Sequence, residues 1–198
     1  MTAEIRADME RAAHATYENG CALRDDALVL YEASRFARAT ALAVLAEEEF
    51  SKAFMLIICV GQDRWDSNIY KALTKHGDKQ GISAAMREYA EWFVDNYKRV
   101  EAANRYSLVR RKPSMHPGDE RMKEILETAK NTAKRPPKDK VKQRSFYVGI
   151  GKDGRATSIP GSGSQKQACE YLSECRVFQV ITEVALGNYS NVSEFYNL

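Results

Sequence analysis

Four charged residues interrupt the most apolar segment of the chain, LAVLAEEEFSKAFMLIICV, residues 42–60. They are three consecutive glutamates, Glu47, Glu48 and Glu49, and a lysine, Lys52. Carboxylates and amines of this kind can move protons, contact phosphate or form ion pairs when they are withdrawn from water. The segment therefore contains either a structural ion pair or a polar functional site.

A helical projection of residues 34–60 separates these charges. Glu47 is expected to face solvent, and Glu49 is expected to pair with arginines near the start of the helix. Glu48 and Lys52 are four residues apart, in the order that favours an ion pair, and both lie on the apolar stripe. Because a buried ion pair carries a desolvation cost, it is weak evidence for stability. A structural pair that orients a bundle and a functional polar site both remain open.

The spacing of apolar residues predicts a mainly α fold, namely an antiparallel helical bundle with a small β-hairpin towards the C-terminus. The predicted helices cover residues 3–32, 34–60, 67–75, 82–110, 119–134 and 164–186. The hairpin is predicted at residues 145–160, where SFYVGIGKDGRATSIP alternates and turns at KDGR. We expect one domain over residues 1–198. Residues 1–112 supply its core helices, and residues 113–144 a basic loop, a polar helix and a linker.

Positive charge is concentrated in the middle of the chain. Residues 98–144 contain 15 Lys and Arg against 6 Asp and Glu, a net charge of +9, whereas the whole chain carries only +3. A basic region in an otherwise acidic protein favours a polyanionic partner, and RNA is the natural candidate. The predicted RNA-binding residues are Lys134, Arg135, Lys138, Lys140, Lys142 and Arg144. The alternative is a solvated helix face and linker that contribute only to solubility.

The composition favours a cytoplasmic protein. No hydrophobic leader follows the opening MTAEIRADMERAA, and the longest apolar run, residues 53–60, is too short to span a bilayer. The four cysteines show no CxxC spacing, which is typical of reduced thiols. We therefore expect no membrane partner, no metal and no other cofactor.

Several short motifs resemble those of the AbiV-type abortive-infection proteins, a branch of the HEPN superfamily. They are Glu18-Asn19 on the first helix, EE-x-x-K ending at Lys52, KHxxK at Lys75–Lys79, and the hairpin motif KQRSFYVGIGKDG. Their order along the chain is that of the family. Two positions depart from its pattern, because Ser51 stands where a glycine is usual and Gly149 where an acidic residue is expected.

The resemblance implies a helical HEPN bundle, commonly dimeric, that defends bacteria against phage by stopping growth or translation. Many HEPN proteins are metal-independent ribonucleases with an Arg-x4–6-His motif. In this chain Arg110 and Arg111 precede His116 with that spacing. Lys71 precedes His76 in the same way, with lysine in place of arginine.

Cleavage of RNA by its own 2′-hydroxyl needs a proton acceptor, a proton donor and cations around the phosphate. The predicted catalytic set is Glu48, Lys52, His76 and Lys79, with Arg111 and His116 as the alternative. In this set Glu48 orients Lys52 or the His76 imidazole, and the two lysines bind a phosphate. His76 transfers the proton during cleavage. The competing interpretations are a helix-end cap for His76 and an exposed loop residue for His116.

The leading hypothesis is a bacterial anti-phage effector that acts on RNA or the translation machinery, as an endoribonuclease if the site is complete. The alternative is a non-catalytic dimeric binding module that blocks translation or senses a phage-encoded protein. A third interpretation, an adaptor bundle, would make the basic region incidental. Apolar residues cover nearly the whole circumference of residues 34–60, more than one bundle face needs, which favours a homodimer.

Overall fold

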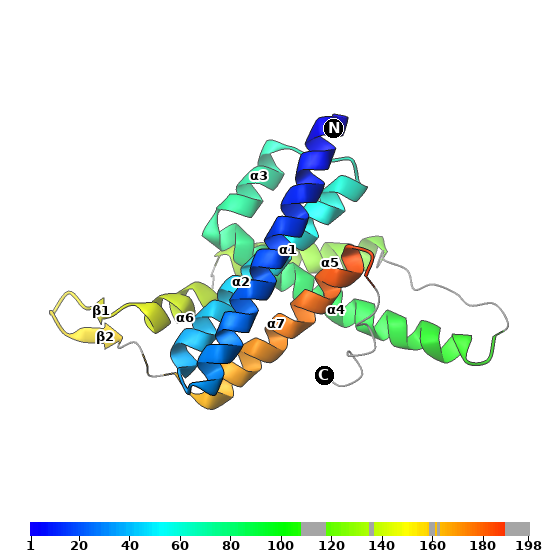
Figure 1. The fold of residues 1–198 in the computed structure, drawn as a ribbon. Helices are drawn as coiled ribbons and strands as arrows, with labels where there is room; N and C mark the ends of the chain where they lie inside the picture. The colour runs from blue at the N-terminus through cyan, green and yellow to red at the C-terminus, as the bar shows by residue number, and fades with distance from the viewer. Residues whose placement is uncertain (108–117, 135–136, 159–160, 162, 189–198) are drawn as a thin grey trace.

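The computed structural model describes residues 1–107, 118–134, 137–158, 161 and 163–188. In these residues seven helices accompany one antiparallel pair of strands (Figure 1). The helices are α1 Ala3–Glu32, α2 Phe36–Gly61, α3 Ser67–Thr74, α4 His76–Asn104, α5 Asp119–Lys134, α6 Pro137–Phe146 and α7 Gln165–Ala185. The strands are β1 Gly149–Ile150 and β2 Ala156–Ser158. The predicted mainly α fold with a small hairpin near the C-terminus is confirmed.

Three helices begin at side chains that cap them. The Thr2 side chain accepts a hydrogen bond from the backbone N of Ile5 at the start of α1. Asp66 accepts from two backbone N–H groups at the start of α3, and Ser164 accepts from the backbone N of Gln167 at the start of α7. Such side chains satisfy N–H groups that have no partner inside the helix, so they fix where each helix begins.

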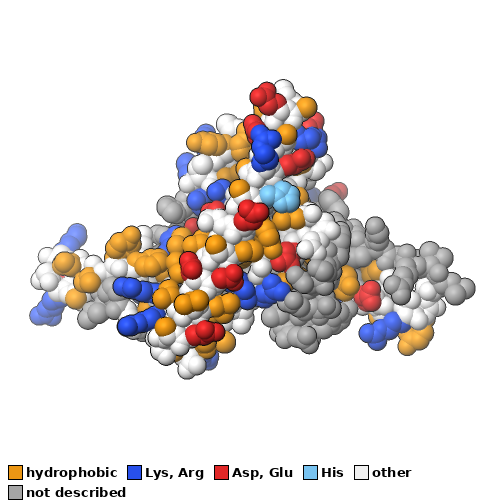
Figure 2. All heavy atoms as spheres, in the orientation of Figure 1, with side chains coloured by type: hydrophobic (Ala, Val, Ile, Leu, Met, Phe, Trp, Pro, Cys, Tyr) orange, Lys and Arg blue, Asp and Glu red, His pale blue; other side chains and the backbone are white. Residues whose placement is uncertain are grey.

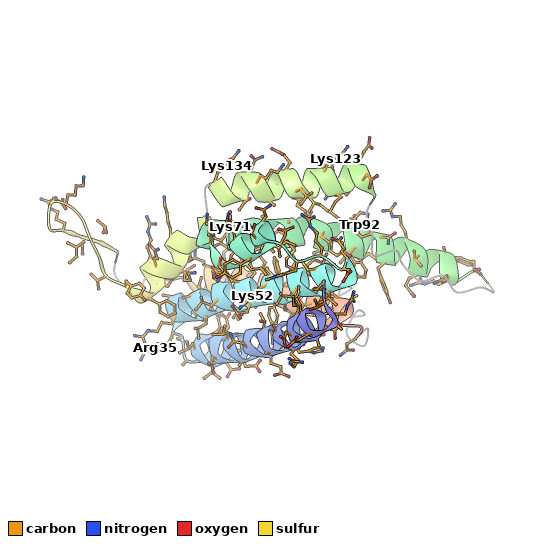
Figure 3. The ribbon with its side chains drawn as sticks, turned by 90° about the horizontal axis from the view of Figure 1, so that it is seen from above. Arg35, Lys52, Lys71, Trp92, Lys123 and Lys134 are labelled. Carbon is orange, nitrogen blue, oxygen red and sulfur yellow. The ribbon has the colours of Figure 1, made fainter. Side chains whose placement is uncertain are left out.

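Helix α2 is the centre of the bundle. Seen from above, α5, α4, α2 and α1 follow one another as successive layers (Figure 3). The main core cluster joins side chains of α1, α2, α4, α5 and α7, and its largest fully buried members include Phe50, Phe93 and Phe178. Because other helices surround α2, even polar residues on it, such as Glu47, Glu48 and Ser51, are buried.

Helix α6 and the hairpin project from one end of the bundle (Figure 1). Residues 137–146 were predicted as linker and hairpin start, but they form a helix that packs on α2. Proline at the first position of α6 fits that helix, since its missing N–H would have no helical partner there. Helix α4 likewise begins at His76, earlier than the predicted residue 82.

The four cysteines are free thiols, and Cys59 and Cys175 are buried. Burial raises the pKa of the Cys175 thiol, so it stays protonated and packs as an apolar side chain. Among the helices of the described ranges, none has both the length and the apolar character to cross a membrane.

Candidate functional site

Glu47 lies at the centre of a cluster of charged side chains contributed by four helices. Lys138 of α6 places its Nζ 2.5 Å from Glu47 Oε2 and 2.7 Å from Oε2 of Glu174 on α7. Arg87 of α4 pairs with the other oxygen of Glu174. We call Glu47, Arg87, Lys138 and Glu174 the ion-pair cluster. It ties α6 to the bundle through charge-assisted hydrogen bonds.

Burial of Glu47 corrects the expectation that it faces solvent, because only 1% of the residue is exposed. The projection placed Glu47 on the polar side of α2, and α6 and α4 cover that side. Ser51, on the same side, donates a hydrogen bond to the Glu47 carbonyl and lies 2.9 Å from Ser83 of α4. A polar helix face is therefore buried here against other polar side chains.

Burial raises the pKa of Glu47 from 4.5 to about 7. Withdrawal from water disfavours the carboxylate, and the nearby charge of Glu174 adds to this effect. Lys138 and Arg87 act in the opposite direction, because positive charges stabilise the ionised form. Glu47 therefore exchanges its proton in the range where a general acid or base works best.

Glu48 forms a second buried ion pair, and its partner is not the predicted one. Lys142 Nζ lies 2.9 Å from Glu48 Oε1, with side chains only 10% and 6% exposed. Lys52 pairs instead with Glu49, at 3.5 Å, and its side chain is 34% exposed. The predicted pairing of Glu48 with Lys52 is therefore wrong. The place of Glu48 on the buried side of α2 is confirmed.

Glu49 also departs from its predicted partners near the start of α2. Besides Lys52, it accepts a hydrogen bond from Asn19 of α1 at 3.2 Å. Asn19 belongs to the Glu18-Asn19 motif singled out in the sequence. This motif therefore contributes to the packing of α1 on α2.

The other predicted catalytic residues are only partly placed. Lys79 is a half-buried residue in the first turn of α4, and His76 is the residue at which α4 begins. The His76 side chain lies outside the described structure, as do the alternative pair Arg111 and His116. Within the described residues, no hydrogen bond or ion pair joins Glu48, Lys52 and Lys79 to one another.

The six predicted RNA-binding residues divide into groups. Lys138 and Lys142 point towards the glutamates of α2. Lys140 and Arg144 are exposed on the opposite side of α6, and Lys134 is exposed at the end of α5 (Figure 3). Arg135 lies outside the described residues.

A basic groove lies between α6 and the hairpin. Its volume is about 360 Å³, and it is lined by Lys140, Gln143, Arg144, Tyr147, Gly149 and Thr157. Tyr147 is 68% exposed, although large aromatic side chains are usually more buried. Lys and Arg side chains also lie at the tip of the hairpin, whereas Asp and Glu side chains lie along the face formed by α1 (Figure 2). The groove therefore combines cations with an exposed ring at a basic end of the molecule.

Several of these residues were missed in the sequence. Glu174 lies on α7 and Arg87 on α4, and no local pattern in the sequence marks either residue. Gln143 lines the groove from α6, and Thr157 lines it from strand β2 of the hairpin. In the parts of the chain that the structure describes, no group of three or more His, Cys, Asp or Glu side chains could hold a metal ion.

A HEPN family model described as AbiV matches residues 8–177, which extend from α1 into α7. No curated protein and no solved structure shows a significant match to the chain. The family match thus includes α6, the hairpin and the helices that carry the ion-pair cluster.

Proposed function

The chain belongs to the AbiV family of the HEPN superfamily, and we propose that it defends the bacterial cytoplasm against phage by binding RNA in the basic groove. Membership identifies a bacterial abortive-infection protein. RNA is the ligand that matches the chemistry of the groove. Bound there, the protein occupies RNA of the translation machinery and stops protein synthesis before the phage matures.

The observation that carries this proposal is the pairing of two exposed cations with an exposed ring. Lys140 and Arg144 are four residues apart on α6, so they lie about one turn from each other on the same face. Their charges suit consecutive phosphates of a single strand, and Tyr147 offers a surface on which a base stacks. Gln143 and Thr157 add hydrogen-bonding groups between them.

The ion-pair cluster and the buried pair of Glu48 with Lys142 support this assignment, because they show which lysines of α6 remain available to RNA. Lys138 and Lys142 are committed to glutamates, and they hold α6 in place. Lys140 and Arg144 can then contact phosphate without a change in the fold. We expect the working form to be a homodimer that presents two such grooves, and a phage-encoded protein to be the signal that activates it.

Salt-dependent RNA binding tests the proposal. Affinity of the purified protein for a labelled single-stranded RNA is measured at increasing salt, beside the variant Lys140→Gln/Arg144→Gln. The logarithm of the binding constant falls as the logarithm of the salt concentration rises, and each lost phosphate contact makes this dependence less steep by about 0.7. The slope of the double variant should therefore be smaller in magnitude by about 1.4. The control variant Lys123→Gln/Lys130→Gln removes two charges from α5 and leaves the slope unchanged. Equal slopes for the wild type and the groove variant would refute the proposal.

A second candidate function is cleavage of the bound RNA. The observation that favours it is the 2.9 Å contact between Ser51 and Ser83, which places the early turns of α4 beside the part of α2 that carries Glu48 and Lys52. His76 begins α4, two turns before Ser83. Total bacterial RNA incubated with the protein in EDTA distinguishes the two functions. New 5′-hydroxyl ends that form with the wild type but not with His76→Ala would establish cleavage. RNA that stays intact although it is bound would show that the protein binds RNA without cutting it.

A further inference from the structure

A polar cavity lies beside the ion-pair cluster, on the inner side of α6. Its volume is about 110 Å³, and it is lined by Glu47, Gln80, Ser83, Ala84, Arg87, Thr132 and Lys138. Glu47, Gln80 and Ser83 form a buried floor, and the remaining residues are partly exposed and form its mouth. A water molecule occupies about 30 Å³ in the liquid, so the cavity has room for a larger polar group.

Two hydrogen-bond donors in this cavity have no partner among the described residues. Gln80 is only 3% exposed, and its Oε1 accepts from the backbone N of Lys138 at 3.1 Å. This contact leaves Gln80 Nε2 buried without an acceptor, and Arg87 Nε is in the same state. Buried donors without partners are rare and costly, so each calls for a bound acceptor.

The remaining charges decide what kind of acceptor fits. Both glutamates of the cluster already accept from Lys138 or Arg87. The early turn of α6 also faces this region, where Lys138 donates to Gln80, and a helix N-terminus favours negative charge. Two buried donors beside the cavity, Gln80 Nε2 and Arg87 Nε, therefore remain without an acceptor. A water molecule would satisfy the two donors but would need acceptors for its own hydrogens.

We propose that this cavity binds a small oxyanion with a single negative charge, either a carboxylate or a phosphodiester. The oxyanion accepts hydrogen bonds from Gln80 Nε2 and Arg87 Nε, and Lys138 supplies positive charge beside it. The ion-pair cluster has two positive and two negative members. A bound monoanion is therefore balanced when Glu47 takes up one proton.

Because Glu47 takes up a proton when the anion binds, the affinity for the anion should depend on pH. The charged and titratable groups around Glu47 come from α4, α6 and α7, and they are Arg87, Lys138, Glu174, Tyr171 and Cys175. The pKa of Glu47 is about 7, and an anion beside it raises that pKa further. The anion therefore binds most strongly below pH 7, where Glu47 is protonated. Affinity falls about tenfold for each pH unit above that pKa, hence about tenfold between pH 6 and pH 8.

Two monoanions that do not titrate in this range serve as probes. Acetate represents carboxylates and dimethyl phosphate represents phosphodiesters, and each is titrated into the full-length protein at constant ionic strength by calorimetry. We expect a millimolar Kd, as suits a ligand of few atoms. Binding of acetate alone identifies a carboxylate site, and binding of dimethyl phosphate alone identifies a nucleic-acid backbone. Absence of binding by both would overturn the proposal and leave the cavity to water.

Substitution of Gln80 provides the sharper test. Gln80→Glu keeps the acceptor for the Lys138 N–H but replaces the unpartnered donor with negative charge, so affinity falls at least tenfold. Gln165→Glu makes the same change on exposed α7 and leaves affinity unaltered. Glu47→Gln imitates the protonated carboxyl and binds equally at pH 6 and pH 8, which tests the site even if Gln80→Glu does not fold. Wild-type affinity in Gln80→Glu, or an unchanged pH profile in Glu47→Gln, would contradict the assignment.

Discussion

Removal of Lys142 alone should damage the fold far more than removal of Lys142 together with Glu48. The two side chains are 10% and 6% exposed and meet at 2.9 Å. In Lys142→Met the Glu48 carboxylate stays buried without that partner, which costs about 3–5 kcal/mol of the free energy of unfolding. In Glu48→Leu/Lys142→Met both charges leave together, and the stability returns to within about 1 kcal/mol of the wild type.

The surface pair on the same helix provides a matched control. Lys52 and Glu49 meet at 3.5 Å with side chains 34% and 19% exposed, so solvent screens their attraction. Lys52→Met should therefore cost less than about 1 kcal/mol. For a chain of this length 1 kcal/mol corresponds to about 2–4 °C in Tm, so Lys142→Met should melt roughly 6–20 °C below the wild type.

Urea denaturation measures these differences, with fluorescence and circular dichroism followed on the same samples so that a two-state transition can be verified. The coupling free energy from the double-mutant cycle is the decisive quantity. A cost below about 1 kcal/mol for Lys142→Met would show that the pair is solvated. A double variant that is as unstable as the sum of the single variants would show that Glu48 and Lys142 do not compensate each other.

Two further predictions concern Glu47 and the contact between α1 and α2. Because the pKa of Glu47 is higher in the folded chain, about 7, than its ordinary 4.5, folding favours the protonated form. The contribution of protonated Glu47 to the free energy of unfolding is fully present below pH 4.5 and is lost as the pH rises through 7, by up to about 3 kcal/mol. Urea denaturation at several pH values should show this loss in the wild type, and Glu47→Gln should remove it. A Cβ at Gly20 would lie 2.8 Å from the buried ring of Phe50, so Gly20→Ala should cost about 1–3 kcal/mol in Tm measurements. Gly61→Ala is the control, because its Cβ would meet no atom within 4 Å, and it should be neutral or stabilising. If Gly20→Ala proves as stable as Gly61→Ala, the Phe50 ring must move aside to accept the new methyl group.

Local patterns in the sequence were sufficient for most of the fold. The apolar spacing of α1 and α2 predicted their bounds to within a few residues, because a helix that packs on one side must repeat its apolar residues every three to four positions. The same spacing correctly placed Glu48 on the buried side of α2. Alternation and a KDGR turn likewise predicted the hairpin. These features depend on residues that are close together in the chain.

Partners that are far apart in the sequence could not be predicted in this way. Glu48 and Lys142 are 94 positions apart, whereas the predicted partner Lys52 is four residues away. A helical projection shows which side of α2 is apolar, but it does not show which segment covers the polar side. Glu47 was therefore assigned to solvent, although Lys138 and Arg87 approach it from two other helices. Its raised pKa is likewise a consequence of tertiary packing.

The basic segment shows most clearly how the backbone conformation decides which residues reach RNA. Lys138, Lys140, Lys142 and Arg144 occur at every second position, so an extended linker would place all four on one side. In helix α6 a step of two residues turns the side chain by roughly 200°, and the four divide into opposite pairs. One pair neutralises the glutamates of α2, and the other pair lines the basic groove. The salt dependence of RNA binding should therefore report about two phosphate contacts from this segment, where an extended linker would give about four.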